Sequence, residues 1–306
     1  MTQRLSLEDL PSHFRHEIQR ELGARIVDSS NCKGGYSPSL AAVCRLDDGR
    51  MVFVKAVSPA QNPDTPNMLR REASVTALLP PSVPAPRLLH VLEDGEWIAT
   101  IYEYAEGSMP AVPWKSSELA KVIGATWALA EVGAPKGIPT LAEHFGEAFT
   151  GWRNLVADPG PNSALDPWSL RFLDRLAALE PSWLAHADGD ELVHGDVRSD
   201  NVLLSSSGVM FVDWSSACTG RSHFDVVCML PSIALEGGGS PEEVLALHGG
   251  SRVDPDAITS LAVACAGYLL DHARRPDPPG LPTVRAFQRA QGEVAVAWLR
   301  SRLGWR

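Results

Sequence analysis

The sequence predicts an α+β protein with two lobes, an N-terminal antiparallel β-sheet lobe that carries a helix and a larger helical C-terminal lobe. Its 306 residues are enough for two lobes that each bury a core of their own. Short runs with β-branched or apolar centres dominate the first hundred residues, whereas long segments with helical spacing begin at Ser116. We therefore expect the lobes to comprise residues 1–105 and 106–306.

The N-terminal lobe is predicted to begin with a helix over residues 7–22, where apolar side chains have helical spacing and Ser6 can act as the N-cap. Strands follow, separated by turns such as residues 47–49, and a second helix is expected from about residue 67 to 79. The turn at residues 93–95 indicates a hairpin between two further strands. The five predicted strands cover residues 25–31, 40–46, 51–57, 87–92 and 97–102.

The C-terminal lobe is predicted to be mostly helical, with short strands only at residues 202–204 and 209–212. Its longest mostly apolar stretch, residues 257–270, is shorter than the roughly 20 residues that cross a bilayer, so we expect a buried helix there. The predicted helices cover residues 116–131, 139–156, 167–186, 222–235, 254–272 and 283–303.

The N-terminus and the cysteines indicate a cytoplasmic protein. Residues 1–14 lack the unbroken apolar core of a signal peptide. The five cysteines are odd in number, scattered and without a CxxC pair, a pattern typical of reduced thiols rather than of a disulfide framework or a zinc site.

The charge balance narrows the possible partners. With 27 basic and 37 acidic side chains the net charge is −10, which repels phosphate backbones and anionic lipid, so we expect no nucleic-acid or membrane partner. Residues 1–105 carry a net charge of −2 and residues 106–306 a net charge of −8. The acidity of the helical lobe fits a cationic ligand, although solubility alone is an equally good explanation.

The strongest chemical signal lies on one predicted loop and the strand pair after it. Residues 192–204 (LVHGDVRSDNVLL) contain Asp196 and Asn201 five positions apart, and Asp213 follows the next strand. Phosphoryl transfer requires this layout, because one carboxylate accepts the proton of the attacking hydroxyl while an amide oxygen and a second carboxylate hold magnesium on the triphosphate. Apolar runs on both sides anchor the loop and position its polar side chains for in-line attack.

This loop resembles a known family. His194-Gly195-Asp196, with Asn201 five residues after the Asp, is similar to the catalytic loop of the aminoglycoside phosphotransferase family, which includes choline, homoserine and methylthioribose kinases. That family shares the protein-kinase-like two-lobe fold. Gly195 stands where protein kinases usually have Arg, which favours the small-molecule branch.

Two later segments extend the resemblance over nearly the whole chain. Asp213-Trp214 resembles the family's metal-binding Asp followed by an aromatic residue. Residues 220–225 (GRSHFD) resemble the segment whose Asp, here Asp225, supports the catalytic loop.

The resemblance also implies nucleotide-binding residues in the N-terminal lobe. Lys55 lies inside the apolar run 51–57, where the kinase pattern places a phosphate-binding Lys. Burying this ammonium without a counter-charge would be costly, and Glu72 on the following helix is the expected partner. Glu93 and Glu103 in the same lobe are the alternatives.

The nucleotide's phosphates and base are expected at two further places. The turn 32–37 (CKGGYS) occupies the position of the family's phosphate-covering turn, and backbone amides around Gly35 and the Ser37 hydroxyl are expected to reach phosphate oxygens. The segment after residue 102 resembles the kinase hinge, so the Glu103 carbonyl and the Ala105 amide are expected to bind the purine edge. A plain hairpin turn and an ordinary interlobe linker remain alternatives, and ATP is not distinguished from GTP.

Arg198 follows the expected base by two residues, and two roles remain open for it. Its guanidinium can stabilise charge on the transferring phosphoryl group, or it can pin the loop by pairing with Asp200. His194 is expected to pack beneath the loop without transferring a proton.

The function implied is transfer of the γ-phosphoryl group of ATP or GTP to a hydroxyl group of a small molecule. Asp196 would be the base, Asn201 and Asp213 would hold Mg²⁺, and Lys55, oriented by Glu72, would bind the α- and β-phosphates.

The acceptor is expected to be cationic, with an antibiotic such as an aminoglycoside as the first choice, because the acidic helical lobe would attract it. Acidic residues at positions 188, 190 and 191 precede the catalytic loop. A metabolic acceptor such as choline, homoserine or an amino sugar is the alternative, and a nucleotide-binding pseudokinase is the rival from another class. Trp114, Trp152 and Trp168 lie where this family builds its acceptor pocket, and one or two are expected to line it.

Overall fold

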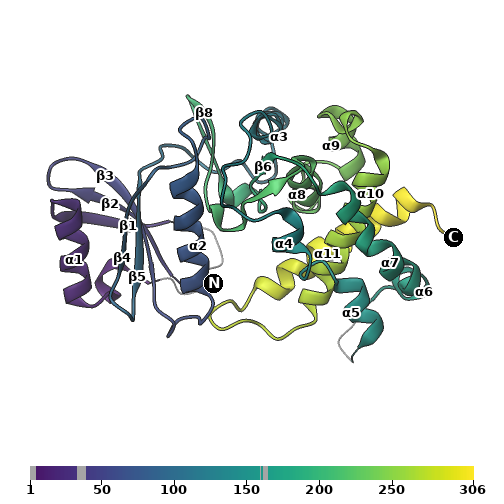
Figure 1. Ribbon diagram of the computed structural model, residues 1–306, viewed down its shortest axis with the longest axis horizontal. Helices are drawn as coiled ribbons and strands as arrows, with labels where there is room; N and C mark the ends of the chain where they lie inside the picture. Colours follow the sequence, from purple (N-terminus) through teal and green to yellow (C-terminus); the bar gives the residue numbers. More distant parts are fainter. Residues whose placement is uncertain (1–4, 33–38, 159, 161–164) are drawn as a thin grey trace.

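The computed structural model describes residues 5–32, 39–158, 160 and 165–306, and it places an N-terminal sheet region beside a larger helical region (Figure 1). The sheet has five strands in the order β1-β2-β3-β5-β4, and every neighbouring pair is antiparallel. Each predicted strand is present to within one residue at either end. The strands are β1 (Ile26–Asn31), β2 (Leu40–Leu46), β3 (Met51–Val57), β4 (Leu88–Glu93) and β5 (Ile98–Glu103).

One helix covers each face of the sheet (Figure 1). Side chains on a strand alternate between the faces, so neighbouring residues of β3 point in opposite directions. Val54 packs on the side of α1 (Ser12–Leu22), whose Phe14 is fully buried. Lys55 points to the other side and contacts α2 (Thr65–Leu78). The sheet thus has an apolar core on one face and presents a single lysine of β3 to α2 on the other.

The first helix starts later than the sequence predicts. A continuous helix over residues 7–22 is wrong, because the chain forms a 3-10 turn, η1 (Leu7–Asp9), before α1. Pro11 separates the two, and Leu10 before it is extended, as the proline ring requires of the preceding residue. Ser6 belongs to the short turn, where its backbone N–H donates to the Asp9 carboxylate at 2.7 Å.

The helical region contains the longer predicted helices, with α10 and α11 packed along each other (Figure 1). The buried helix expected at residues 257–270 lies within α10. The remaining helices are α3 (Ser116–Leu129), α4 (Leu141–Phe145), α5 (Gly151–Ala157), α6 (Pro167–Arg171), α7 (Leu173–Leu179), η2 (Glu180–His186), η3 (Ser199–Asn201), η4 (Trp214–Ser216), α8 (His223–Leu235), α9 (Pro241–Leu247), η5 (Gly250–Arg252), α10 (Pro255–Ala273) and α11 (Val284–Leu303). In the described part of the chain, no helix is long and apolar enough to span a membrane.

Two predicted helices are wrong as single elements. The segment 139–156 divides into α4 and α5, and the segment 167–186 divides into α6, α7 and η2. α5 begins at Gly151, which lies so close to α10 that a Cβ atom there would be 2.0 Å from the Gly267 carbonyl oxygen. This close crossing of two backbones sets where α5 begins, and it depends on tertiary packing that helical spacing does not reveal.

Four short strands connect the helices around one loop: β6 (Glu191–Val193), β7 (Val202–Ser205), β8 (Gly208–Phe211) and β9 (Cys218–Gly220). β7 and β8 match the predicted strands and form a hairpin. β6 and β9 pair with each other but are only three residues long, too short to show an alternating pattern in the sequence.

Candidate active site

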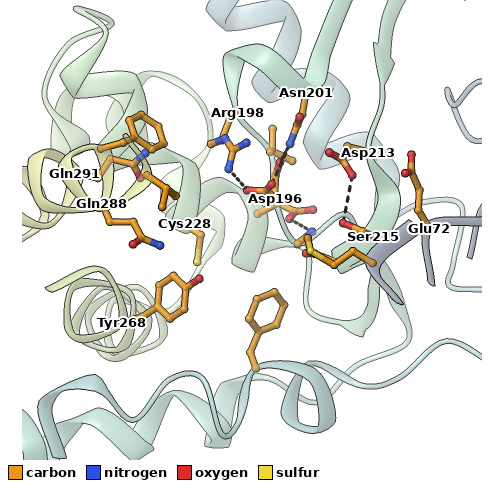
Figure 2. A pocket seen from close by; sticks show the side chains of 18 of the residues that line it. Glu72, Asp196, Arg198, Asn201, Asp213, Ser215, Cys228, Tyr268, Gln288 and Gln291 are labelled. Carbon is orange, nitrogen blue, oxygen red and sulfur yellow. Dashed lines mark hydrogen bonds and ion pairs between the residues drawn. The ribbon is translucent and has the colours of Figure 1, made fainter. Parts of the chain in front are cut away.

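The two strand pairs place the predicted catalytic loop next to the predicted metal-binding segment. Asn201 directly precedes β7, and Asp213 lies just beyond β8, the partner of β7. A hydrogen bond from the Val212 N–H to the Asn201 carbonyl, 3.0 Å long, closes this end of the hairpin. The side chains of Asp196, Asn201 and Asp213 consequently converge on one space (Figure 2).

Two side chains hold the Asp196 carboxylate. The Asn201 amide nitrogen donates to one carboxylate oxygen at 3.0 Å and to the Asp196 carbonyl at 2.8 Å. Arg198 donates to the other carboxylate oxygen at 2.9 Å. Burial raises the pKa of the Asp196 carboxyl to about 6, although Arg198 opposes the rise. A carboxyl group with this pKa is ionised at neutral pH and is a better proton acceptor than an ordinary aspartate.

Arg198 connects the two aspartates of the loop. Its Nε donates to Asp200 at 3.0 Å while a terminal nitrogen donates to Asp196, so the pairing with Asp200 is formed. The guanidinium also lies 5.9 Å from the centre of the Phe287 ring on α11. Arg198 lines the same cavity as Asp196, so pinning the loop and stabilising charge are compatible roles for one side chain.

Asp225 on α8 supports the loop from below. Its carboxylate accepts the backbone N–H groups of His194 and Gly195, both at 2.7 Å. Gly195 has a φ of 82°, and a Cβ atom there would be 2.3 Å from the Ser216 carbonyl oxygen, so the position requires glycine. The buried His194 ring bonds the Val212 carbonyl at 3.0 Å, and burial lowers its pKa to about 4. A neutral histidine packed under the loop agrees with the structural role predicted for it.

Lys55 and Glu72 form the predicted ion pair. The Lys55 ammonium donates to both carboxylate oxygens, at 2.7 and 2.8 Å, and lies 3.7 Å from Asp213. Burial raises the pKa of the Glu72 carboxyl, and the Lys55 charge opposes the rise. Glu93, one of the alternative partners, pairs instead with Arg70.

Arg71 is a site-supporting residue that the sequence analysis missed. It lies beside Glu72 on α2 and donates to the backbone carbonyls of Ser215 and Ala217, at 2.5 and 3.3 Å. These bonds fasten α2 to the segment that follows Asp213. Because every residue has a backbone carbonyl, no pattern in the sequence marks such a contact.

Asp213 has an uncommon backbone conformation and a stabilised negative charge. Its φ of 67° lies in the left-handed region, which non-glycine residues rarely adopt. Burial by itself would raise the pKa of its carboxyl, but Lys55 and Arg198 together hold that pKa below its ordinary value.

The oxygen atoms of Asn201 and Asp213 suit magnesium, which prefers one or two carboxylates together with phosphate oxygens. Because the Asn201 amide nitrogen faces Asp196, its amide oxygen is left as the atom that can bind a metal ion. Among the described residues, no group of three or more His, Cys, Asp or Glu side chains could hold a metal ion by itself. The residues therefore fit an ion that completes its ligands with a nucleotide.

Two cavities meet at these side chains. The hinge cavity, of about 470 Å³, extends along the sheet to Glu103 and Ala105. The α10–α11 cavity, of about 450 Å³, reaches from Asp196 to the helices α10 and α11 (Figure 2). We call the polar residues that line both cavities the junction; they are Lys55, Glu72, Asn201 and Asp213.

Other predicted residues lie elsewhere. Gly35 and Ser37 are outside the described residues. Asp188, Asp190 and Glu191 line neither of the two cavities, and Glu191 pairs with Arg221 on the surface. The charge cluster expected to attract the acceptor is thus not part of the site formed by the described residues.

The three tryptophans expected near the acceptor also line neither cavity. Trp114, Trp152 and Trp168 are core residues of the helical region. Trp152 is fully buried and its indole N–H donates to the Val263 carbonyl at 2.8 Å. The rings that line the α10–α11 cavity belong instead to Tyr268 and to phenylalanines on or next to α4, α8 and α11.

The fold and the arrangement of these side chains define a kinase-like phosphotransferase. Residues 31–262, well over half of the chain, match the model of the phosphotransferase enzyme family (APH). The chain belongs to this family, which confirms the family predicted from the catalytic loop, and it is a phosphotransferase.

Solved structures share the fold over almost the whole chain. A thermostable mutant of aminoglycoside phosphotransferase APH(4)-Ia, in a ternary complex with AMP-PNP and hygromycin B, has a TM-score of 0.64 at 17% identity, covering 96% of this chain and 100% of that chain. A putative fructosamine-3-kinase from Haemophilus somnus 129PT has a TM-score of 0.58 at 13% identity, with coverages of 95% and 96%. Amicoumacin kinase hAmiN, in complex with AMP-PNP, Ca²⁺ and Ami, has a TM-score of 0.57 at 11% identity, with coverages of 91% and 93%. No curated protein matches the sequence.

Proposed function

We propose that this protein transfers the γ-phosphoryl group of ATP or GTP to a hydroxyl group of a small molecule, with a nucleotide in the hinge cavity and the acceptor in the α10–α11 cavity. The observation that carries the proposal is the junction, because a phosphate group placed there touches both cavities. Reacting groups brought together in this way gain most of the rate advantage of an intramolecular reaction.

The nucleotide is held by residues of both lobes, 1–105 and 106–306. Lys55, oriented by Glu72, binds phosphate oxygens, and the Glu103 carbonyl and Ala105 amide face the base in the hinge cavity. Asn201 and Asp213 would hold Mg²⁺, which would neutralise charge on the phosphates. The backbone around Gly35 and the Ser37 hydroxyl remain predicted phosphate contacts.

The acceptor hydroxyl approaches Asp196, which takes its proton as the oxygen attacks phosphorus. A raised carboxyl pKa favours this step, since the best general bases have a pKa near the working pH. Arg198 keeps the carboxylate oriented and places a positive charge near the transferred group. The acceptor is an antibiotic or a metabolite.

The protein works in a reducing compartment such as the cytoplasm, which suits its five free cysteines.

The proposal is tested by measuring nucleotide turnover with purified protein. Mg·ATP and Mg·GTP are supplied with a panel of hydroxyl compounds that includes antibiotics and amino alcohols, and ADP or GDP release is followed. We expect turnover that depends on Mg²⁺ and is lost in Asp196→Asn. If the protein binds nucleotide but shows no turnover at all, not even slow transfer of the phosphoryl group to water, it is instead a pseudokinase.

A further inference from the structure

The far end of the α10–α11 cavity differs in character from the junction. Its wall, which we call the acceptor wall, faces Asp196 across the cavity and comes from α4, α10, α11 and the residues between α4 and α5 (Figure 2). Its main side chains are Phe145, Phe149, Tyr268, Phe287, Gln288 and Gln291. In the described part of the chain, none of the cavity-lining side chains from these elements is charged.

Three of the four carboxylates that line this cavity are held by protein groups, and the fourth, Asp213, lies at the junction, 3.7 Å from the Lys55 ammonium. Both oxygens of Asp225 accept backbone N–H groups, and Asp196 is paired with Arg198. Glu72 is paired with Lys55. An ammonium group on the distal part of an acceptor would lose its water and meet no carboxylate on the acceptor wall, which makes its burial costly.

The charged groups behind the acceptor wall are largely basic or already paired. Arg285 on α11 donates to the Gln288 amide oxygen at 2.8 Å. Asp271, one turn after Tyr268 on α10, is buried and pairs with Arg274 and Arg275. On the acceptor wall, as far as the described residues form it, a polycation would therefore meet no carboxylate and would approach the Arg285 guanidinium behind Gln288.

Three neutral groups on this wall can form hydrogen bonds with a ligand. Arg285 has no acceptor atom, so its bond to the Gln288 oxygen leaves the Gln288 NH₂ group directed toward the cavity as a donor. Gln291 is 6% exposed, lines the cavity, and its amide has no hydrogen-bond partner among the described residues. Its amide atoms are not among the fully buried side-chain atoms that lack a partner in the described part of the chain, so they open onto the cavity and are available to a ligand atom. Tyr268 points into the same space (Figure 2).

We infer that the acceptor is an uncharged hydroxyl compound with an aromatic or alicyclic part, and that it is not a polycation. The ring part lies against Phe145, Phe149 and Phe287, while neutral oxygen atoms of the compound bond to Gln288 and Gln291. Apolar walls with a few placed polar groups are how small-molecule sites combine affinity with specificity. This inference rests on the proposed function, since it describes the acceptor of that reaction.

The experiment uses two isosteric probes and the full-length protein saturated with Mg·AMP-PNP. The uncharged dye N-phenyl-1-naphthylamine, whose fluorescence rises in apolar cavities, is bound first and then displaced. The competitors are 4-ethylphenyl β-D-glucopyranoside and 4-(aminomethyl)phenyl β-D-glucopyranoside, which differ only in a methyl group against an ammonium group. Hygromycin B and streptomycin serve as polycationic competitors.

We expect the ethyl compound to displace the dye at a concentration at least about tenfold lower than the aminomethyl compound, with both aminoglycosides weaker still. Gln288→Glu should reduce this ratio at least about tenfold, because one carboxylate oxygen keeps the bond to Arg285 while the second replaces the amide nitrogen that is directed toward the cavity. Gln19→Glu on α1, the same substitution far from the cavity, should leave the ratio unchanged.

Three results would overturn the inference: no dye binding, displacement by a cationic competitor at an equal or lower concentration, or an unchanged ratio in Gln288→Glu. Failure of the proposed function is separate, because it is measured by nucleotide turnover. A protein that hydrolyses ATP in an Asp196-dependent manner but binds only aminoglycosides keeps the proposed function and loses this inference. If the protein prefers the neutral ethyl glucoside but never turns over nucleotide, the proposed function fails while the preference of the cavity for an uncharged ligand stands.

Discussion

The junction and the acceptor wall lie at opposite ends of one cavity and are built on opposite principles. The junction consists of charged or strongly polar side chains held by short hydrogen bonds, such as Lys55 to Glu72 at 2.7 Å. The acceptor wall consists of rings and neutral amides, and its Gln291 has no bond to another described residue. Moving a phosphoryl group requires fixed charges, whereas choosing an acceptor requires shape and a few neutral contacts.

The largest effect is expected from Asp196→Asn, which removes the base and keeps the size of the side chain. We expect kcat for phosphoryl transfer to fall by roughly 10²–10⁴-fold while Mg·ATP affinity stays nearly unchanged, because the base contacts the acceptor hydroxyl. Single-turnover kinetics and calorimetry measure the two quantities, with Asp190→Asn on the surface as the matched control. A variant that keeps more than about a tenth of wild-type kcat would contradict the role of Asp196.

Asp213→Ala tests the nucleotide side of the junction. In the proposed function this carboxylate would supply a hard oxygen to the magnesium ion of the bound nucleotide, so its loss should weaken Mg·ATP or Mg·GTP binding at least about tenfold. Calorimetry with and without Mg²⁺ measures this, and Asp188→Ala is the control outside both cavities. Unchanged affinity for both nucleotides would show that Asp213 does not hold the metal ion.

The pH dependence of turnover tests the electrostatics around Asp196. The base must be ionised, and burial raises its pKa to about 6, so kcat/KM should fall about tenfold per pH unit below pH 6. Arg198→Gln removes a charge that opposes this rise, so the acid limb should move to higher pH. Arg221→Gln, an exposed arginine near neither cavity, should leave it in place. If kcat/KM of the wild-type enzyme falls only near the pKa of an ordinary aspartate, burial does not raise the pKa of Asp196.

Gly195→Ala asks how tightly the loop beneath the junction is packed. A Cβ atom at this position would approach the Ser216 carbonyl oxygen to 2.3 Å, and φ is 82°. Gly49 has a similar φ of 89° but nothing within 4 Å of the added atom, so Gly49→Ala carries the backbone strain alone. We expect Gly195→Ala to lower the free energy of unfolding by about 1–3 kcal/mol more than Gly49→Ala. If denaturant titrations give the same loss of unfolding free energy for Gly195→Ala and Gly49→Ala, the loop accommodates the added methyl group without destabilising the fold.

The smallest effect is expected at the acceptor wall, from salt. A neutral ligand feels little long-range field, so the Kd of N-phenyl-1-naphthylamine should change less than about twofold between roughly 0.05 and 0.5 M NaCl. Mg·ATP affinity should fall over the same range because it depends on charges at the junction. A ligand affinity that weakens steeply with salt at the acceptor wall would restore the view that the net charge of −8 on residues 106–306 recruits a cation.

The sheet and the catalytic loop were predictable because their information is local. Alternation of apolar residues locates strands such as β3, and Asp196 and Asn201 lie five positions apart on one loop, where their side chains are hydrogen-bonded. Helix boundaries were less predictable, since the break between α4 and α5 and the close approach of Gly151, the first residue of α5, to Gly267 belong to the tertiary packing. The contact of Arg71 with backbone carbonyls is equally invisible, because its partners carry no side-chain signature.

The sequence by itself determined the fold class, the family and the set of charged residues at the junction, since these depend on short motifs whose spacing a single loop or strand enforces. Only the tertiary structure decided which residues line the α10–α11 cavity opposite Asp196. Phe145, Tyr268 and Gln288 lie on three helices far apart in the chain, and rings and amides at helical spacing look the same in a core as in a binding site. It is the packing of α10 against α11, opposite Asp196, that turns these ordinary residues into the wall of a cavity.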